Sequence, residues 1–184
     1  MILFQNVISQ LKAFLWLFLN YKKAWILILP SLNMVPFSLF LFSLVIYGFS
    51  QYQSVLEPET FFTGNRLVFT LLSAITLLVI VVFNALFLAM AYHKIFQQFS
   101  IGKIIGFVSF SVIPFVICKA LNLFTGWQIF NYLQFITVFA FWNGLTVLFE
   151  ISNSKKVQIT TLAMLLFYLL FAFTNASVSG ILSN

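Results

Sequence analysis

The sequence predicts an all-α, polytopic integral membrane protein with five transmembrane helices and an interfacial amphipathic helix at its N-terminus. Of the 184 residues, 62% are hydrophobic and only 7% are charged, and the mean hydropathy is +1.10. These values lie far outside the averages for soluble domains. The apolar residues also form five runs of roughly 20 residues, the length that a helix needs to cross a hydrocarbon core of about 30 Å. Finally, the lysines stand singly or in pairs at the ends of these runs.

Residues 1–21 are predicted to form an amphipathic helix that lies in the membrane interface. In such a helix Gln5, Ser9 and Lys12 share one side, and an apolar set occupies the other. This set consists of Phe4, Val7, Ile8, Leu11 and Leu15. Because no basic region precedes the apolar part and no small-residue cleavage site follows it, we do not expect a signal peptide. A short sixth span is the alternative, but the amides, the hydroxyl and the lysine favour the interfacial helix.

Residues 22–184 are predicted to form one transmembrane domain of five helices. The expected spans are residues 25–49, 67–90, 104–124, 127–149 and 157–173. Before the first span, Lys22 and Lys23 are placed to meet lipid headgroups, and Tyr21 and Trp25 are interpreted as part of an aromatic belt at the membrane surface.

The first span contains Pro30 and Pro36. Each proline removes a backbone donor, so this helix is expected to kink or break early. A broken helix that lines a substrate cavity and a kinked helix that only packs are both compatible with this pattern.

The third span has marked ends. It follows a turn at Gly102 and Lys103, carries Pro114 near its middle and ends at a tight turn formed by Thr125 and Gly126. Trp127, which comes next, is of the type found at membrane interfaces.

Polar side chains within the spans are candidates for contacts between helices. Asn84 stands beside Ala85 and Ala89, which lie one turn apart, and this pattern predicts a close helix contact with a hydrogen bond across it. At the turn after the fourth span, an acidic residue and two lysines form either a docking patch for a partner or a solvated turn. The candidates for helix packing or partner contacts are Asn84, Pro114, Asn131, Trp142, Asn143, Glu150, Lys155 and Lys156. The asparagines are equally compatible with a polar pathway through the membrane.

The distribution of basic residues predicts the orientation. With the N-terminus in the cytoplasm, seven of the nine lysines and arginines face that side, as the positive-inside rule requires. They are Lys12, Lys22, Lys23, Lys94, Lys103, Lys155 and Lys156. Arg66 and Lys119 fall on the other side, and five spans then place the C-terminus outside.

Chemistry-bearing residues are few and far apart. Glu57 and Glu59 share an outer loop and Glu150 borders the opposite face, so a catalytic carboxylate pair is not expected. His93 is the single histidine and Cys118 the single cysteine, which disfavours a metal site or a catalytic triad. We therefore expect no enzyme activity, no catalytic, cofactor-binding or metal-binding residues, no cofactor, and no nucleic-acid partner.

Several motifs of the second half carry a family resemblance. A basic turn (Phe99–Lys103) leads into a span with Ser111 and Pro114, and a Leu-Phe-Thr-Gly turn follows. The next span contains Phe-Trp-Asn-Gly-Leu (Phe141–Leu145), and a Ser-x-x-Lys turn (Ser152–Lys155) precedes the last span. The chain resembles the Yip domain family, five-span membrane proteins that interact with Rab-type GTPases in eukaryotes. The match is best over about Leu86–Leu170 and extends to the first 51 residues only as a hydropathy pattern.

The resemblance implies a five-helix membrane domain with a cytoplasmic N-terminus and an outward C-terminus. Eukaryotic members are non-enzymatic adaptors in vesicle traffic, and some bacterial relatives accompany exporters of the ABC class. Because this chain lacks their long cytosolic N-terminal region, it is expected to be a bacterial-like member in the inner (plasma) membrane.

Two functions follow as hypotheses. The first is a non-catalytic accessory or scaffold protein that assembles with or regulates a larger membrane complex, such as an ABC exporter, with the lipid bilayer and other membrane subunits as its partners. The alternative is the substrate-binding membrane subunit of a small-solute or vitamin transporter.

Overall fold

The computed structural model describes residues 12–13, 15–16, 19–31, 35–54 and 66–182, and this part of the chain is helical without a strand. The predicted interfacial helix over residues 1–21 lies mostly outside the described residues, as does the acidic loop that follows the first predicted span. In chain order the elements are α2 (Tyr21–Ile28), a 3₁₀ turn η1 (Leu29–Ser31), α3 (Val35–Ser54), α4 (Arg66–Ala91), α5 (His93–Phe96), α6 (Ile101–Thr125), α7 (Ile129–Leu133), α8 (Ile136–Leu148) and α9 (Asn153–Leu182).

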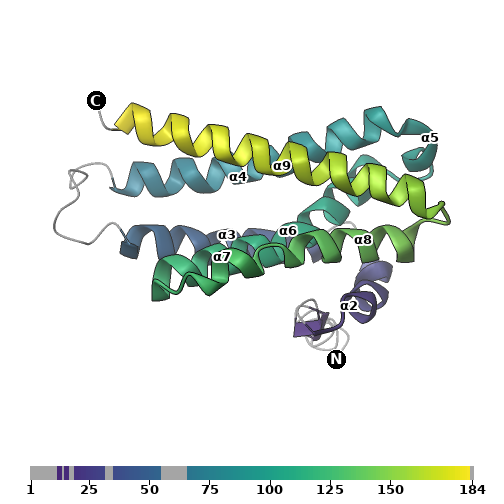
Figure 1. The fold of residues 1–184 in the computed structure, drawn as a ribbon, viewed down its shortest axis with the longest axis horizontal. Helices are drawn as coiled ribbons and strands as arrows, with labels where there is room; N and C mark the ends of the chain where they lie inside the picture. Colours follow the sequence, from purple (N-terminus) through teal and green to yellow (C-terminus); the bar gives the residue numbers. More distant parts are fainter. Residues whose placement is uncertain (1–11, 14, 17–18, 32–34, 55–65, 183–184) are drawn as a thin grey trace.

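The long helices lie side by side along the long axis of the molecule (Figure 1). α3, α6 and α9 run in one direction, while α4 and the α7–α8 pair run in the other. One end of the bundle therefore carries α2, α5 and the α8–α9 turn, and the opposite end carries the α6–α7 turn and the end of α9.

Within the described residues, 3 helices are long and apolar enough to cross a membrane: Thr70–Ala91, Ile101–Thr125 and Asn153–Thr174. α3 contributes a shorter apolar stretch, Pro36–Gln51. The structure is thus all-helical, with three candidate membrane-spanning helices.

The first predicted span is divided in two. α2 ends at Ile28, the 3₁₀ turn that contains Pro30 follows, and α3 begins at Val35. Pro30 cannot donate a helical hydrogen bond and its ring collides with the preceding turn, which stops α2. Pro36 is the second residue of α3, where a missing N–H costs little. The early break that the two prolines predict is present.

The fourth predicted span is also interrupted, between α7 and α8, although no proline stands there. At this junction the backbone tightens into i→i+3 hydrogen bonds, from Phe135 N–H to the Tyr132 carbonyl and from Thr137 N–H to the Gln134 carbonyl. The Tyr168 hydroxyl of α9 donates to the Gln134 carbonyl at 3.3 Å, which gives this carbonyl a partner on another helix.

α6 is the central helix. Of its apolar window 78% is buried, against 39% for α4 and 28% for α9, because α3, α4, α7 and α8 pack around it. A helix that is apolar on all sides is expected in such a position. Its ends are well defined: the Ser100 hydroxyl accepts the Lys103 N–H, and Gly126 closes the helix in the left-handed region at φ 71°. The tight turn predicted at Thr125 and Gly126 is confirmed.

Trp25 contradicts one expectation. Its interpretation as a membrane-surface residue is wrong, because its ring is 0% exposed and lies inside the protein. The indole Nε1–H donates to the Ala140 carbonyl of α8 at 2.7 Å. The ring centroid lies 5.3 Å from that of Phe107 and 4.8 Å from that of Phe110, both on α6. Trp25 therefore joins α2 to α8 and to α6 at once.

Gly144 provides the space that Trp25 occupies. A Cβ at this position would lie 2.6 Å from atoms of both the Trp25 and Phe107 rings. Such a distance is shorter than any real contact of a Cβ, and both rings are themselves buried. The glycine is thus required by the close approach of three helices.

Replacement of Gly144 by alanine tests this packing. We expect Gly144→Ala to lower the unfolding temperature in detergent, because overpacking a buried contact costs about 1–3 kcal/mol. The matched control is Gly102→Ala, since a Cβ there meets nothing within 4 Å. The control should leave stability unchanged or raise it, because alanine is favoured over glycine in a helix by about 0.5–1 kcal/mol. Equal melting temperatures for the two variants would contradict the packing role of Gly144.

Candidate functional site

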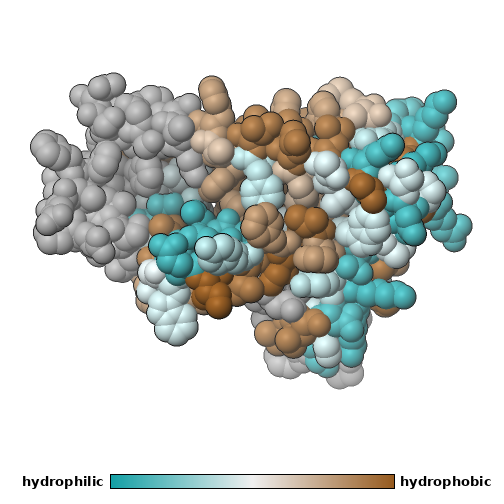
Figure 2. All heavy atoms as spheres, viewed as in Figure 1, coloured by the Kyte–Doolittle hydropathy of each residue, from teal (hydrophilic) through white to brown (hydrophobic). Residues whose placement is uncertain are grey.

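Six of the lysines gather at one end of the bundle, whereas Lys119 lies towards the other end of α6. Lys22 and Lys23 lie on α2, Lys94 on α5 and Lys103 in the first turn of α6. The first turn of α9 adds Lys155 and Lys156. Figure 2 shows the result, with hydrophilic residues over the end that carries α2, α5 and the start of α9, and a hydrophobic surface across the middle of the bundle. This polar end is the candidate functional site.

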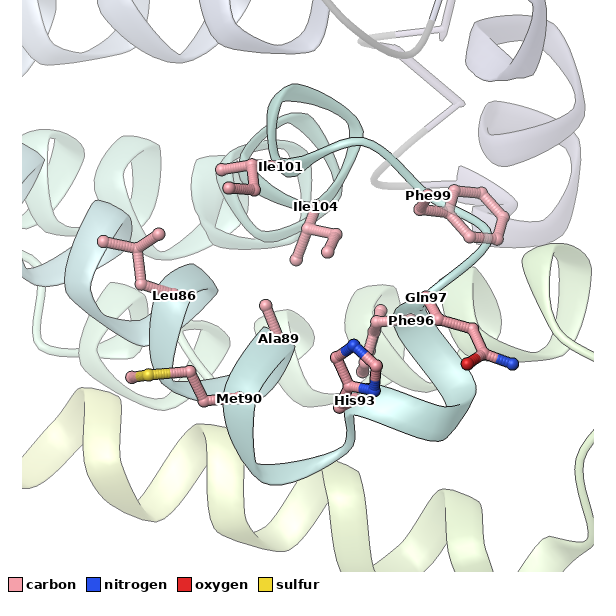
Figure 3. A pocket seen from close by; sticks show the side chains of 9 residues that line it. All are labelled: Leu86, Ala89, Met90, His93, Phe96, Gln97, Phe99, Ile101 and Ile104. Atoms are coloured by element: carbon pink, nitrogen blue, oxygen red, sulfur yellow. The ribbon is translucent and has the colours of Figure 1, made fainter.

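A cavity of about 760 Å³ opens at this end between α4, α5 and the start of α6 (Figure 3). We call it the α4–α6 cavity. Its walls are mostly apolar, with Ala89 and Met90 on one side and Ile104 on the other. The His93 imidazole points into it, and Gln97 borders it. Among the described residues that line it, none is acidic.

Two smaller hollows connect this region with the α8–α9 turn. The first hollow, of about 350 Å³, lies between α5 and α9 and is lined by Lys94, Lys155 and Gln158 among others. Lys94 also borders the second, of about 460 Å³, together with Glu150. Within the described residues Glu150 forms no ion pair, and it is exposed like Lys155. The predicted docking patch therefore includes Lys94 as well as Glu150, Lys155 and Lys156.

Asn84 lies away from this end, in the interior. Its side chain is 0% exposed, and its amide Nδ2 donates to the Ala163 carbonyl of α9 at 2.9 Å. This is the predicted hydrogen bond across a helix contact. Of the two neighbouring alanines, Ala85 is buried, whereas Ala89 lines the α4–α6 cavity. The Asn84 Oδ1 and the nearby Thr160 hydroxyl on α9 are buried without a hydrogen bond to any described residue.

Pro114 lies buried in the middle of α6. It removes the donor that the Phe110 carbonyl would otherwise receive. One turn earlier, the Ser111 hydroxyl donates to the Phe107 carbonyl at 2.9 Å. α6 nevertheless remains continuous from Ile101 to Thr125, because the surrounding helices hold it in place.

Asn131, Trp142 and Asn143 are partly exposed and do not converge on a cavity. The Gln134 amide donates to Asn131 Oδ1 at 2.9 Å within the α7–α8 junction. Asn143 Nδ2 donates to the carbonyl of Phe139, one turn back on its own helix, also at 2.9 Å. None of the three lines the α4–α6 cavity.

The cavity itself was not predicted from the sequence. The sequence contains a signal for the cavity in the spacing of Met90, His93 and Gln97. At helical spacing these positions place the polar His93 and Gln97 side chains on the same side as the apolar Met90 side chain. The described residues contain no group of three or more His, Cys, Asp or Glu side chains that could hold a metal ion. Comparison of the chain with protein-family models, with curated proteins and with solved structures found no match in any of the three.

The role of Asn84 can be measured directly. We expect Asn84→Ala to lower the unfolding free energy in detergent by about 1 kcal/mol, because a hydrogen bond between membrane helices contributes about 0.6 kcal/mol on average and a small void is added. Asn143→Ala removes a hydrogen bond within one helix and should have little effect. A destabilisation by Asn143→Ala equal to that by Asn84→Ala would contradict the special role of the α4–α9 contact.

Proposed function

We propose that the chain is an integral membrane protein that crosses the bilayer five times, through α3, α4, α6, α7–α8 and α9. The alternating directions of these segments support the proposal (Figure 1). α3 adds a fourth crossing, since its 20 residues span about 30 Å. The α7–α8 pair adds the fifth. It packs against α6 and α9, and the Gln134 carbonyl at its interruption accepts a hydrogen bond from the Tyr168 hydroxyl of α9.

The orientation follows from the polar end. Six lysines lie at the polar end: Lys22, Lys23, Lys94, Lys103, Lys155 and Lys156. The positive-inside rule places them in the cytoplasm. The N-terminus is then cytoplasmic and the C-terminus is outside. A bacterial inner membrane is the location that the family resemblance implies.

Cysteine labelling tests this topology. The native Cys118, which is only 3% exposed, is first replaced by alanine so that each variant carries one cysteine. Ser154→Cys probes the α8–α9 end and Gln128→Cys probes the α6–α7 turn; both positions are exposed. We expect a membrane-impermeant maleimide to label Gln128→Cys on intact cells, and Ser154→Cys only after permeabilisation. Labelling of both positions from the same side would refute the crossing by α7–α8, and the reverse pattern would invert the orientation.

For its function, we propose a non-catalytic accessory or scaffold subunit of the Yip-like type, which belongs to a larger membrane complex such as an ABC exporter. The observation that supports this role is the hydrogen bonding of the asparagine side chains within the predicted spans. Asn84 bonds to the backbone of α9, Asn131 to Gln134, and Asn143 to its own helix. A solute pathway needs polar groups that converge on one cavity, whereas these groups stabilise helices and helix contacts.

The partner would dock at the polar end. Glu150 and Lys155 are exposed there and Lys156 is partly so, and Lys94 borders the same hollows. Charges of both signs in a fixed arrangement favour a protein partner with a complementary pattern.

The transporter alternative gains support from one feature, the α4–α6 cavity. Its volume of about 760 Å³ falls within the range of about 300–1,000 Å³ that is usual for small-molecule sites. A water-soluble molecule that stays bound to the purified protein would favour this second function.

Copurification in mild detergent distinguishes the accessory role. We expect a stoichiometric membrane partner with the natural chain, and about a tenfold lower yield with a triple variant, Glu150→Lys, Lys155→Glu and Lys156→Glu, because misplaced charges oppose docking. The control Lys22→Gln with Lys23→Gln changes the net charge by the same amount, −2, and should keep the partner. A functional protein that purifies alone, or an equal loss with the control, would contradict the proposal.

A further inference from the structure

The α4–α6 cavity opens towards the apolar flank of the bundle. Met90 on α4 is 70% exposed and Ile101 on α6 is 58% exposed, and both line the cavity. Large exposed apolar side chains on the sides of membrane helices face acyl chains, so the opening between them gives lipid a way in. Ala89, which is small, lies between these edges and leaves the space open (Figure 3).

The end of the cavity nearer the lysines is polar. His93 and Gln97 are exposed residues of the α5 turn, and the His93 ring points inward (Figure 3). Lys94 follows His93 directly. Lys103 lies in the first turn of α6, with its Nζ 5.8 Å from the ring centroid of Phe99, which also lines the cavity. Within the described residues neither lysine is in an ion pair, although Lys94 borders one hollow together with Glu150. Two cations therefore stand beside the polar end.

We propose that this cavity binds one acyl chain of an anionic phospholipid, whose headgroup lies at His93 and Gln97 and interacts with Lys94 and Lys103. The apolar walls fit a hydrocarbon chain, the side opening fits its entry from the bilayer, and the two lysines select a negative headgroup. A free inorganic anion would use only the lysines and leave the apolar space unfilled. The inference requires that the helices lie in a bilayer and does not depend on the accessory role.

The geometry also sets the depth of the site. The lysines at this end mark the level of the headgroups, and the cavity extends from there along α4 towards Leu86 and along α6 towards Ile104. A lipid from the same leaflet therefore reaches it with its headgroup and its chain in their usual order. No rearrangement of the helices is needed for entry.

Native mass spectrometry of the full chain from nanodiscs tests the proposal. The nanodiscs contain equal amounts of phosphatidylcholine and phosphatidylglycerol, and the lipids that remain on the protein are counted by class. We expect one retained phosphatidylglycerol on the natural chain. Ala89→Phe fills the cavity, and Met90→Trp covers its exposed edge without entering the packed interior. Each variant should lower the retention of phosphatidylglycerol about tenfold.

Two controls separate the site from general attraction. Val79→Phe changes a 58% exposed position on α4 that lies outside the cavity, and it should leave retention unchanged. Lys94→Gln with Lys103→Gln should abolish the preference for phosphatidylglycerol but keep one bound lipid, whereas Lys22→Gln with Lys23→Gln should keep the preference. The inference would be overturned by unchanged lipid retention in Met90→Trp, or by an equal effect of the two lysine double variants. A water-soluble molecule or a polypeptide bound in place of lipid would also overturn it.

Discussion

The enclosure of α6 is the constraint on which the other contacts depend. This helix is apolar on all sides, so it has no polar face that could fix its rotation. In a bilayer the hydrophobic effect does not favour neighbouring helices over lipid, so close packing and hydrogen bonds must hold the bundle together. Trp25 supplies both, since it reaches the Ala140 carbonyl through its Nε1–H and lies against Phe107 in the space that Gly144 leaves.

The same packing explains why a cavity exists at the polar end. α4 does not continue directly into α6, because the single-turn helix α5 turns the chain aside. Phe96 of α5 is 2% exposed, and its ring centroid lies 4.9 Å from that of Phe149 at the end of α8. Phe149 in turn lies 4.8 Å from Phe99. The aromatic side chains of this junction therefore pack against Phe149, although Phe96 and Phe99 also form part of the cavity wall. The gap between Ala89 and Ile104 remains open.

Much of the fold could be predicted from local chemistry, and the rest depends on contacts between distant segments. The break near Pro30, the glycine turn at Gly126 and the helix contact at Asn84 each follow from the properties of one residue and its neighbours. The break between α7 and α8 has no such signal, because it depends on backbone tightening and on the Tyr168 hydroxyl from α9. Trp25 beside two lysines has the sequence pattern of a membrane-surface residue. Only the glycine at position 144, more than a hundred residues later, places it inside.

Lys94 links the two proposed roles of the polar end. It stands beside the α4–α6 cavity and also lines the hollow that it shares with Lys155, so two like charges border one small space. An anionic headgroup near Lys94 would reduce their repulsion, but it would also lower the positive potential that a negative surface of a partner meets at Lys155 and Lys156. Because such coupling is reciprocal, a docked negative surface would likewise weaken the binding of the lipid. Lipid and partner would then compete for the same positive charges, and the amount of negative lipid in the leaflet would set how readily the partner docks.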